Sequence, residues 1–407
     1  MKSAFTVLGL FFSSLLFSQP TGFKYSREIS SVSGTWNRII IPGDIFKKSD
    51  SQLCDLRIFG FSEKDTLEIP YFIRLMETQE EQKQFPAVIL NKSQKGETFS
   101  ATLSLKSKPV INHLNLKFGL QNFDLVADLE GSHDQKNWFT VSENQRLISI
   151  HNEFTDYSFT ELHFPDSDFS YYRLTFHSAK NPDLQQSVVL HTAETPGTYN
   201  TIPLILSSER TDAKEKRTEW ILTTDKIEPV SFLKLRITSG FDYYRPVSIE
   251  VLADSIKTPN GIIPVYNPIY SGIISSLDTS GFRIPLTVSG QYKVTIYNRD
   301  NQPLNLISAN LKSPVHEAVA RFTEGYSYFL FYGNSAKPFP DYDIEIFKNK
   351  IPANLNTAVL GNEVLISGSV SEPAVGFLDS PAALWMVMGL LIAGLGFFTL
   401  KMIRQKE

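Results

Sequence analysis

The chain has 407 residues, of which 42% are hydrophobic and 20% charged, so it is neither a disordered chain nor a polytopic membrane protein. Its formal net charge of −4 argues against a nucleic-acid partner, which needs a basic face. The single cysteine, Cys54, excludes an intrachain disulfide and a metal site built of cysteines. The length predicts two or three domains.

The N-terminus, MKSAFTVLGLFFSSLLFSQP, has the pattern of a secretory signal peptide. Lys2 precedes an apolar stretch, residues 4–17, that is too short to span a bilayer. We therefore predict a signal peptide over residues 1–18, cleaved between Ser18 and Gln19. An uncleaved anchor or a buried strand is the alternative interpretation.

Residues 20–375 have the pattern of β-strands. Alternation of apolar and polar residues occurs in HLNLKF (113–118), YYRLTF (171–176), FLKLRI (232–237) and YDIEIF (342–347). Period-two alternation is typical of antiparallel sheets with one packed face, and turn-forming residues separate the runs. The sequence therefore predicts an all-β fold of sandwiches or jelly rolls.

An internal repeat occurs at an offset of 120 residues. YYRLTFHSAKNPDL (171–184) aligns with QYKVTIYNRDNQPL (291–304). The same offset pairs Pro109-Val110 with Pro229-Val230, Phe123 with Tyr243, and Glu130 with Glu250. Self-similarity at a fixed spacing predicts a duplicated β-sandwich module.

The predicted organisation has a β-domain, two modules and a connection to a membrane. We expect an N-terminal β-domain over residues 19–100, a first module over 101–195, a second over 196–347, and a stalk over 348–380. The stalk assignment rests on the mixed Pro, Asn, Ser and Gly content of that segment.

The C-terminal segment has the properties of a transmembrane helix. Residues 382–400 carry no charge and would cover about 30 Å as a helix, the thickness of a bilayer core. Lys401, Arg404 and Lys406 follow directly. We predict a single span over 381–400 with a cytoplasmic tail over 401–407. A buried helix of a globular domain is the alternative.

Two resemblances follow from these motifs. Ser132, Asp134 and Trp138 in one hairpin, with Tyr172 to Leu174 in a later strand, resemble the discoidin-like, galactose-binding-like jelly roll of coagulation-factor type C domains. The second copy has no Trp in the stretch after Glu250, so we expect its hairpin to be remodelled.

The whole chain also resembles a bacterial family of unknown function, domain of unknown function 3999. The features are LCDLRIFGFSEKDTLEIPYFI (53–73), YYRPVSIEVLAD (243–254) and LWMVMGLLIAGLGFFTLKMIRQ (384–405). This resemblance implies an exported, tail-anchored β-protein of the bacterial inner membrane with its ectodomain in the periplasm. It implies no activity.

No catalytic, cofactor or metal signature stands out in the sequence. Six of the seven histidines lie between residues 113 and 191, but none are spaced i, i+4 and no HExxH occurs. We interpret His113 and His163 as ordinary strand histidines, with metal ligands converging from distant strands as the alternative. Asp166 and Asp168 are interpreted as turn residues, with a calcium site as the alternative. We predict that the protein is not an enzyme.

The best candidate for ligand binding is Tyr243, Tyr244 and Arg245, after Gly240, since successive strand residues face opposite ways and one tyrosine should point outward. Packing in the core and its rim is the alternative. The leading hypothesis is a membrane-anchored, periplasm-facing protein that binds a glycan or another envelope protein. A structural subunit with a multi-spanning partner is the second hypothesis, and an envelope glycosidase the third.

Overall fold

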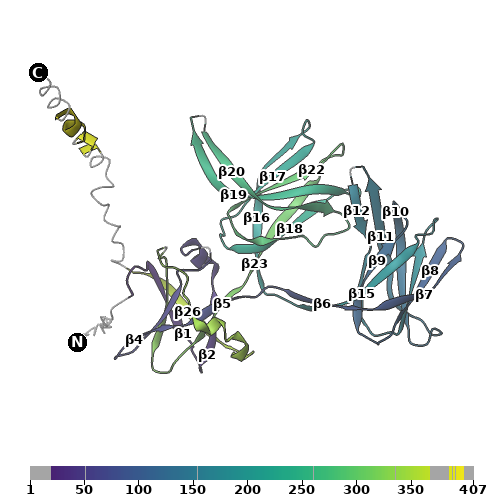
Figure 1. The fold of residues 1–407 in the computed structure, drawn as a ribbon, viewed down its shortest axis with the longest axis horizontal. Helices are drawn as coiled ribbons and strands as arrows, with labels where there is room; N and C mark the ends of the chain where they lie inside the picture. The colour runs from purple at the N-terminus through teal and green to yellow at the C-terminus, as the bar shows by residue number, and fades with distance from the viewer. Residues whose placement is uncertain are drawn as a thin grey trace, which may run out of the picture. The chain divides into compact units, whose positions relative to one another are not determined.

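The structure is a computed structural model (Figure 1). It describes residues 20–50, 52–153, 155–259, 261–334, 336–366, 385–386, 388–389 and 391–397. The predicted signal peptide (1–18) and cytoplasmic tail (401–407) lie outside the described residues, and the predicted span lies within them only in part. No described helix has the length and apolar character needed to cross a membrane. Strands dominate the described chain, which confirms the predicted all-β fold.

The first β-domain is built from both ends of the chain, and we call it the host domain. Its strands are β1 (Tyr25–Ser30), β2 (Trp36–Ile41), β3 (Arg57–Phe61), β4 (Thr66–Ile69), β5 (Tyr71–Leu75), β24 (His316–Arg321), β25 (Ser327–Tyr332) and β26 (Asn356–Leu365). They lie in the order β4-β3-β25-β1-β26-β2-β24-β5, and a 3-10 helix, η1 (Gly43–Lys47), follows β2. Figure 1 shows β1 and β26, from opposite ends of the chain, in one domain.

β26 is central to the host domain because it pairs on both sides. It runs antiparallel to β1, with Ser30 opposite Val359, and parallel to β2, with Ile39 opposite Ala358. Ala358 and Ile39 are both buried in the host core. The strand therefore joins two layers that would otherwise have open edges.

Buried charges also link the two ends of the chain. The Asp55 carboxylate is buried and accepts hydrogen bonds from the backbone N–H groups of Gly333 (2.7 Å) and Asn334 (2.9 Å). Glu317 on β24 is buried between Arg74 of β5 (2.6 Å) and Arg38 of β2 (3.3 Å). Each carboxylate thus has charged or dipolar partners that offset its desolvation.

These pairings place domain boundaries differently from the sequence-based expectation. Residues 316–347 were expected in the second module and 348–380 in a stalk, yet β24, β25 and β26 belong to the host sheet. The predicted strand YDIEIF (342–347) contains the 3-10 helix η2 (Asp343–Glu345) instead, and η3 (Lys348–Lys350) follows it. Pro338 and Pro340, which lack backbone N–H donors, precede that segment and disfavour ladder pairing.

The first sandwich begins at residue 79, inside the segment expected in the N-terminal domain. Its strands are β6 (Gln79–Phe85), β7 (Ala87–Lys95), β8 (Thr98–Leu105), β9 (Ile111–Phe118), β10 (Phe123–Ser132), β11 (Phe139–Asn152), β12 (Thr155–Phe159), β13 (Glu161–Ser167), β14 (Tyr171–His177) and β15 (Leu184–Thr195). They form two sheets, β12-β11-β10-β14-β8-β7 and β13-β9-β15-β6. Leu114, Leu116 and Leu174 are buried in its core, as their alternation predicted.

The second sandwich has its own core. Its strands are β16 (Tyr199–Asp212), β17 (Arg217–Thr223), β18 (Pro229–Thr238), β19 (Tyr244–Thr258), β20 (Gly261–Ser275), β21 (Phe282–Val288), β22 (Gln291–Tyr297) and β23 (Asn305–Pro314). The long β16 joins the two layers, because residues 199–204 pair with β23 and residues 205–212 pair with β17.

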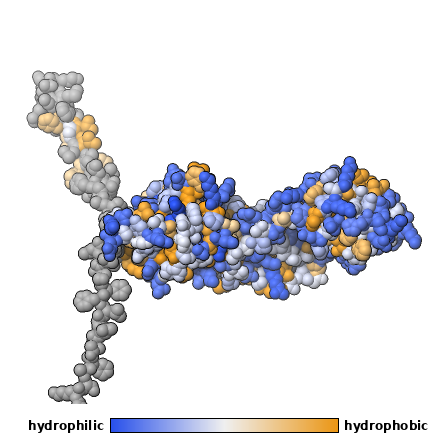
Figure 2. Space-filling view, turned by 90° about the horizontal axis from the view of Figure 1, so that it is seen from below, coloured by the Kyte–Doolittle hydropathy of each residue, from blue (hydrophilic) through white to orange (hydrophobic). Residues whose placement is uncertain are grey.

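The two sandwiches share one strand order, which confirms the predicted duplication. The order β11-β10-β14-β8-β7 in the first corresponds to β20-β19-β22-β17-β16 in the second, and β13-β9-β15-β6 corresponds to β21-β18-β23-β16. The register also agrees at the predicted offset: Ala127 pairs with Phe176, and Val247 pairs with Ile296. On the face drawn in Figure 2, hydrophilic residues predominate and hydrophobic ones form small separate patches, as expected of sheets with one solvated face.

Candidate functional site

A groove of about 510 Å³ opens on the second sandwich beside β18, at the point where the pairing of β18 with β21 ends. β21 pairs with β18 only as far as Leu233 opposite Phe282, while β18 continues to Thr238. The loop after β20 lies beside the uncovered part of β18, and Gly281 in that loop has a φ of +108°. A side chain at Gly281 would meet the Leu233 carbonyl at 2.9 Å, so glycine permits this close approach.

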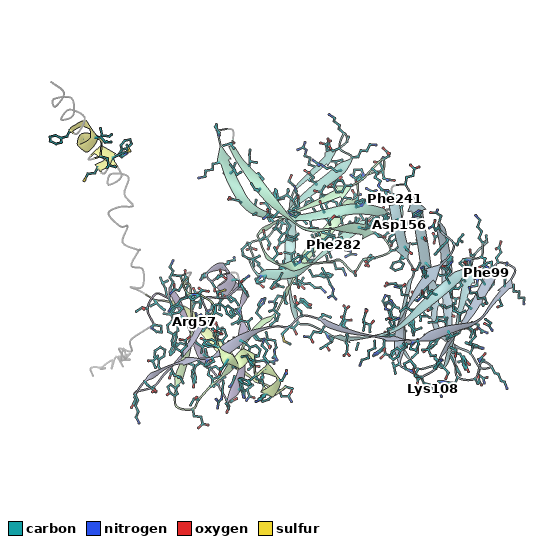
Figure 3. All side chains as sticks on the ribbon, viewed as in Figure 1. Arg57, Phe99, Lys108, Asp156, Phe241 and Phe282 are labelled. Atoms are coloured by element: carbon teal, nitrogen blue, oxygen red, sulfur yellow. The ribbon has the colours of Figure 1, made fainter. Side chains whose placement is uncertain are left out.

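The groove lining combines an aromatic ring with polar groups over an apolar floor. Its principal residues are Tyr243, Arg236, Asp278, Asn310, Ser308 and Phe282. Figure 3 labels Phe282, which is buried and belongs to the core of this sandwich. The arrangement offers donors and acceptors beside a ring, over apolar surface.

Tyr243 is held in place by its neighbours in the loop. Its backbone N–H donates to Ser276 Oγ (3.3 Å), its carbonyl accepts from the Ser276 N–H (3.0 Å), and Ser276 Oγ donates to Asp242 Oδ1 (2.9 Å). Burial raises the pKa of the Tyr243 hydroxyl, opposed by the charge of Arg245. The phenol therefore stays neutral at pH 7 and both donates and accepts hydrogen bonds.

The structure brings only Tyr243 of the predicted triplet into the groove lining. Arg245 is 2% exposed, faces the core with Val247, and donates from Nη1 to Asn298 Oδ1 at 2.6 Å. Burial lowers its pKa. Tyr244 lies on the opposite face of β19. Arg245 therefore packs in the core, as the alternative interpretation stated, and Tyr243 remains the candidate for ligand binding.

Sequence reasoning missed the polar side of the groove. Arg236 lies on the polar face of FLKLRI, which alternation did predict to point outward. Asp278 and Asn310 come from a loop and from β23. No sequence signal marks them as neighbours of Tyr243, because that requires the strand register.

A second cluster, on the outer face of the first sandwich, consists of Glu130, Arg173 and Trp138. Arg173 Nη2 lies 2.7 Å from Glu130 Oε2, and the guanidinium carbon lies 4.3 Å from the centre of the Trp138 ring. A cation over an aromatic face stabilises the hairpin that carries the ring. Arg173 also covers one face of the Trp138 ring, so Trp138 packs within its own module.

The second sandwich carries the equivalent cluster, with Glu250, Lys293 and Tyr266. Lys293 pairs with Glu250, and its Nζ lies 4.8 Å from the centre of the Tyr266 ring. Tyr266 pairs with Leu252 in a longer hairpin, which confirms the expected remodelling. Tyr266 takes the place of Trp138, eight positions later than the constant offset predicts.

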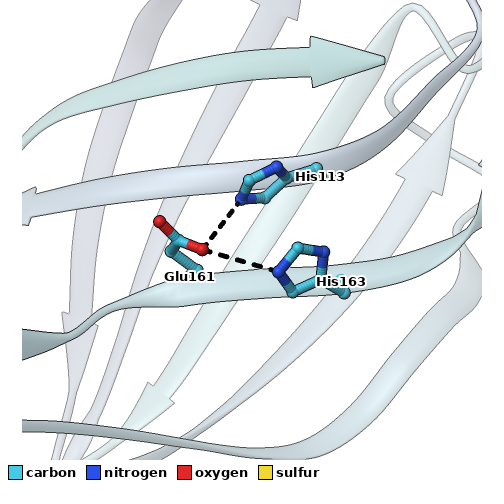
Figure 4. Close-up of side chains that lie close together, drawn as sticks. All are labelled: His113, Glu161 and His163. Atoms are coloured by element: carbon cyan, nitrogen blue, oxygen red, sulfur yellow. Dashed lines mark ion pairs between the residues drawn. The ribbon is translucent and has the colours of Figure 1, made fainter. Parts of the chain in front are cut away.

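The third cluster contains groups that could hold a metal ion: His113 on β9 and Glu161 and His163 on β13 (Figure 4). Glu161 Oε2 lies 3.5 Å from Nε2 of each histidine. Burial and the neighbouring His163 lower the pKa of His113, opposed by Glu161. Asn115 Nδ2 donates to Glu161 Oε1 at 3.3 Å.

Comparisons with known proteins show similarity only to solved structures. No family model and no curated protein matches the chain, so membership of the 3999 family stays a prediction. A glycoside hydrolase 29 family member from an unknown rumen bacterium is similar at 12% identity and a TM-score of 0.19, over 54% of this chain. The chain spans 40% of that protein's length.

Two further structures are similar over most of their own length. The CBM32-1 and CBM32-2 domains of Clostridium perfringens ZmpB, in complex with GalNAc, are 8% identical with a TM-score of 0.19, over 63% of this chain and 92% of that one. A truncated AlyQ with CBM32 and alginate lyase domains is 8% identical with a TM-score of 0.23, over 62% and 98%.

Proposed function

We propose that the protein is a non-catalytic binding protein whose second sandwich takes up a glycan in the Tyr243 groove. The observation that carries this proposal is the meeting of Tyr243 with Arg236, Asp278 and Asn310 around one cavity of about 510 Å³. That volume lies within the roughly 300–1,000 Å³ typical of small-ligand sites.

The hydrogen-bonding inventory of the groove matches a polyol. Arg236 only donates, Asp278 only accepts when ionised, and Asn310 does both. A sugar presents adjacent hydroxyls, each of which donates and accepts, and its C–H face is apolar enough to pack on a tyrosine ring. Lys234 also lines the groove, so its two cations and one carboxylate are compatible with a neutral or an acidic sugar.

The setting of this function comes from the sequence. The predicted signal peptide and the predicted span over 382–400 would place the sandwiches on the periplasmic side of a bacterial inner membrane. The resemblance to the 3999 family supports the same orientation. The proposed ligand is therefore a glycan of the cell envelope.

The test is a binding assay on the purified full chain in detergent. A glycan array identifies a ligand, and calorimetry then measures its Kd for the wild type and for Tyr243→Ala and Arg236→Ala. We expect each variant to weaken binding by at least tenfold, about 1.4 kcal/mol. Tyr297→Ala, which changes an exposed tyrosine outside the groove lining, is the matched control. Glycan binding that survives both groove variants would contradict the proposal.

A further inference from the structure

The register of two neighbouring strands places three metal-ligand side chains on one surface. β9 pairs with β13 so that His113 lies directly opposite His163, and Glu161 lies two residues before His163 on the same face. Leu114 and Leu162 alternate with them and point into the core. The cluster therefore lies on the outer face of the four-stranded sheet of the first sandwich.

His113 is a buried polar group without an adequate partner. Its side chain is 6% exposed, and neither of its ring nitrogens forms a hydrogen bond within the part of the chain that the structure describes. The 3.5 Å approach of Glu161 Oε2 to Nε2 is too long for a well-formed hydrogen bond. A buried unsatisfied nitrogen costs free energy, and a group bound to His113 would offset that cost.

The distances fit a bound ion better than direct contacts. In a tetrahedral site with bonds of about 2.1 Å, ligand atoms lie roughly 3.4 Å apart. Glu161 Oε2 lies 3.5 Å from Nε2 of both histidines. Asn115 holds the other oxygen, Oε1, at 3.3 Å and so directs Oε2 toward the histidines, as an outer partner of a metal ligand does.

The two imidazole rings already lie together. Their centres are 4.1 Å apart with an interplanar angle of 24°. His163 has a side chain that is 65% exposed, so its ring has room to turn about its bonds and direct its nitrogen lone pair at a shared ion. His113 is held by burial and Glu161 has one hydrogen bond from Asn115, so the more exposed His163 is the ligand with most room to adjust.

We propose that His113, Glu161 and His163 bind a divalent transition-metal ion of the zinc class through Nε2, Oε2 and Nε2. Imidazole nitrogen favours Zn²⁺, Ni²⁺ or Cu²⁺, whereas Ca²⁺ and Mg²⁺ require oxygen ligands. Three protein ligands leave one position for water or for a group on another molecule. The ion would also tie β13, the edge strand of this sheet, to β9.

The experiment is calorimetric titration of the metal-free full chain with ZnCl₂, repeated with CaCl₂. We expect one zinc ion per chain and no comparable calcium binding. Because His113 is buried, the exposed ligands are replaced: His163→Ala and Glu161→Gln should each weaken zinc binding by at least tenfold. His151→Ala, which removes an exposed histidine lying 3.4 Å from Asp156, is the matched control and should leave the Kd unchanged.

A variant of the residue that orients Glu161, together with absorption spectroscopy, separates this site from adventitious binding. Asn115→Ala should weaken zinc binding by about 10–100-fold, since it removes the group that orients the carboxylate. Visible absorption of the Co²⁺-loaded chain should show tetrahedral coordination in the wild type and lose it in His163→Ala. Zinc affinity that is equal in the wild type, His163→Ala and Glu161→Gln would overturn the proposal, as would the absence of zinc binding.

Discussion

Replacing Ala358 by Asp tests whether β26 is an interior strand of the host domain. Ala358 is 2% exposed and lies opposite Ile39 in the parallel pairing with β2. Its neighbour Val359 is 52% exposed and points to the other face. Ala358→Asp therefore forces a carboxyl group into the core, whereas Val359→Asp leaves one in water.

The expected magnitude follows from linkage. Burial raises the folded-state pKa of the introduced carboxyl above pH 7, whereas its unfolded-state pKa is about 3.9. The penalty then grows over about three pH units at 1.36 kcal/mol each, reaching about 4 kcal/mol at pH 7. Because the folded pKa is the higher one, the electrostatic penalty is absent well below pH 3.9 and appears as the pH rises. A stability of about 5–15 kcal/mol per domain leaves little margin for such a loss.

Hydrogen exchange of the full chain measures this effect strand by strand. Ala358→Asp should lower the protection of β1 and β2 at pH 7, with β9 of the first sandwich as an internal reference. Val359→Asp should change stability by no more than about 0.5 kcal/mol. Equal protection of β1 and β2 in the two variants would refute the assignment of β26 to the host core.

Three further predictions concern polar groups. Tyr172→Phe, which removes a hydroxyl that accepts a backbone hydrogen bond and shares another with a serine, should cost the first sandwich about 1 kcal/mol in urea unfolding. Glu317→Ala should cost the host domain about 2–3 kcal/mol in the same assay, because it leaves Arg38 and Arg74 unpaired at a partly buried site; a loss below 0.5 kcal/mol would contradict this. Backbone N–H groups of its own turn hold the pKa of Asp134 well below its usual range, so it stabilises the hairpin above about pH 3.9 and loses this effect as the pH falls through its depressed pKa. Carbon NMR titration of the carboxyl should give a midpoint clearly below 3.9.

The alternation of apolar and polar residues predicted the sheets well, because it follows which side chains are buried. Leu114 and Leu116 are buried as HLNLKF indicated, and Leu233 is buried as FLKLRI indicated. YDIEIF has the same alternation, but it buries only Ile344, with Tyr342 partly buried against the host core and Ile346 exposed. Alternation indicates which residues would share a face if the segment were a strand. The segment forms a strand only where a neighbouring strand pairs with it.

The host domain could not be predicted from local patterns. β1 and β26 are separated by more than 320 residues, and neither belongs to the repeat. Tertiary packing decides the pairing between them, and the composition of a single strand does not indicate its partner. The role of Tyr266 in the second hairpin was also not predicted, because an inserted stretch moves it away from the constant offset of 120 residues.

The candidate sites were predictable only in part. Tyr243 was identified because it follows a turn and belongs to a tyrosine pair. The burial of Arg245 depends on the facing of β19, which the sequence alone left open. Glu161 and His163 share a face by simple alternation, but His113 joins them only through the register of β9 on β13.

Construction of the host domain from both chain ends sets an order of maturation. When the ribosome has made β5, the strands that complete its sheet lie some 240 residues ahead, a delay of roughly 10–50 s at typical rates of synthesis. Both sandwiches contain all their own strands and can close during that interval. The first five strands must wait with open edges, so the host domain is the last part to mature and the one most in need of a chaperone.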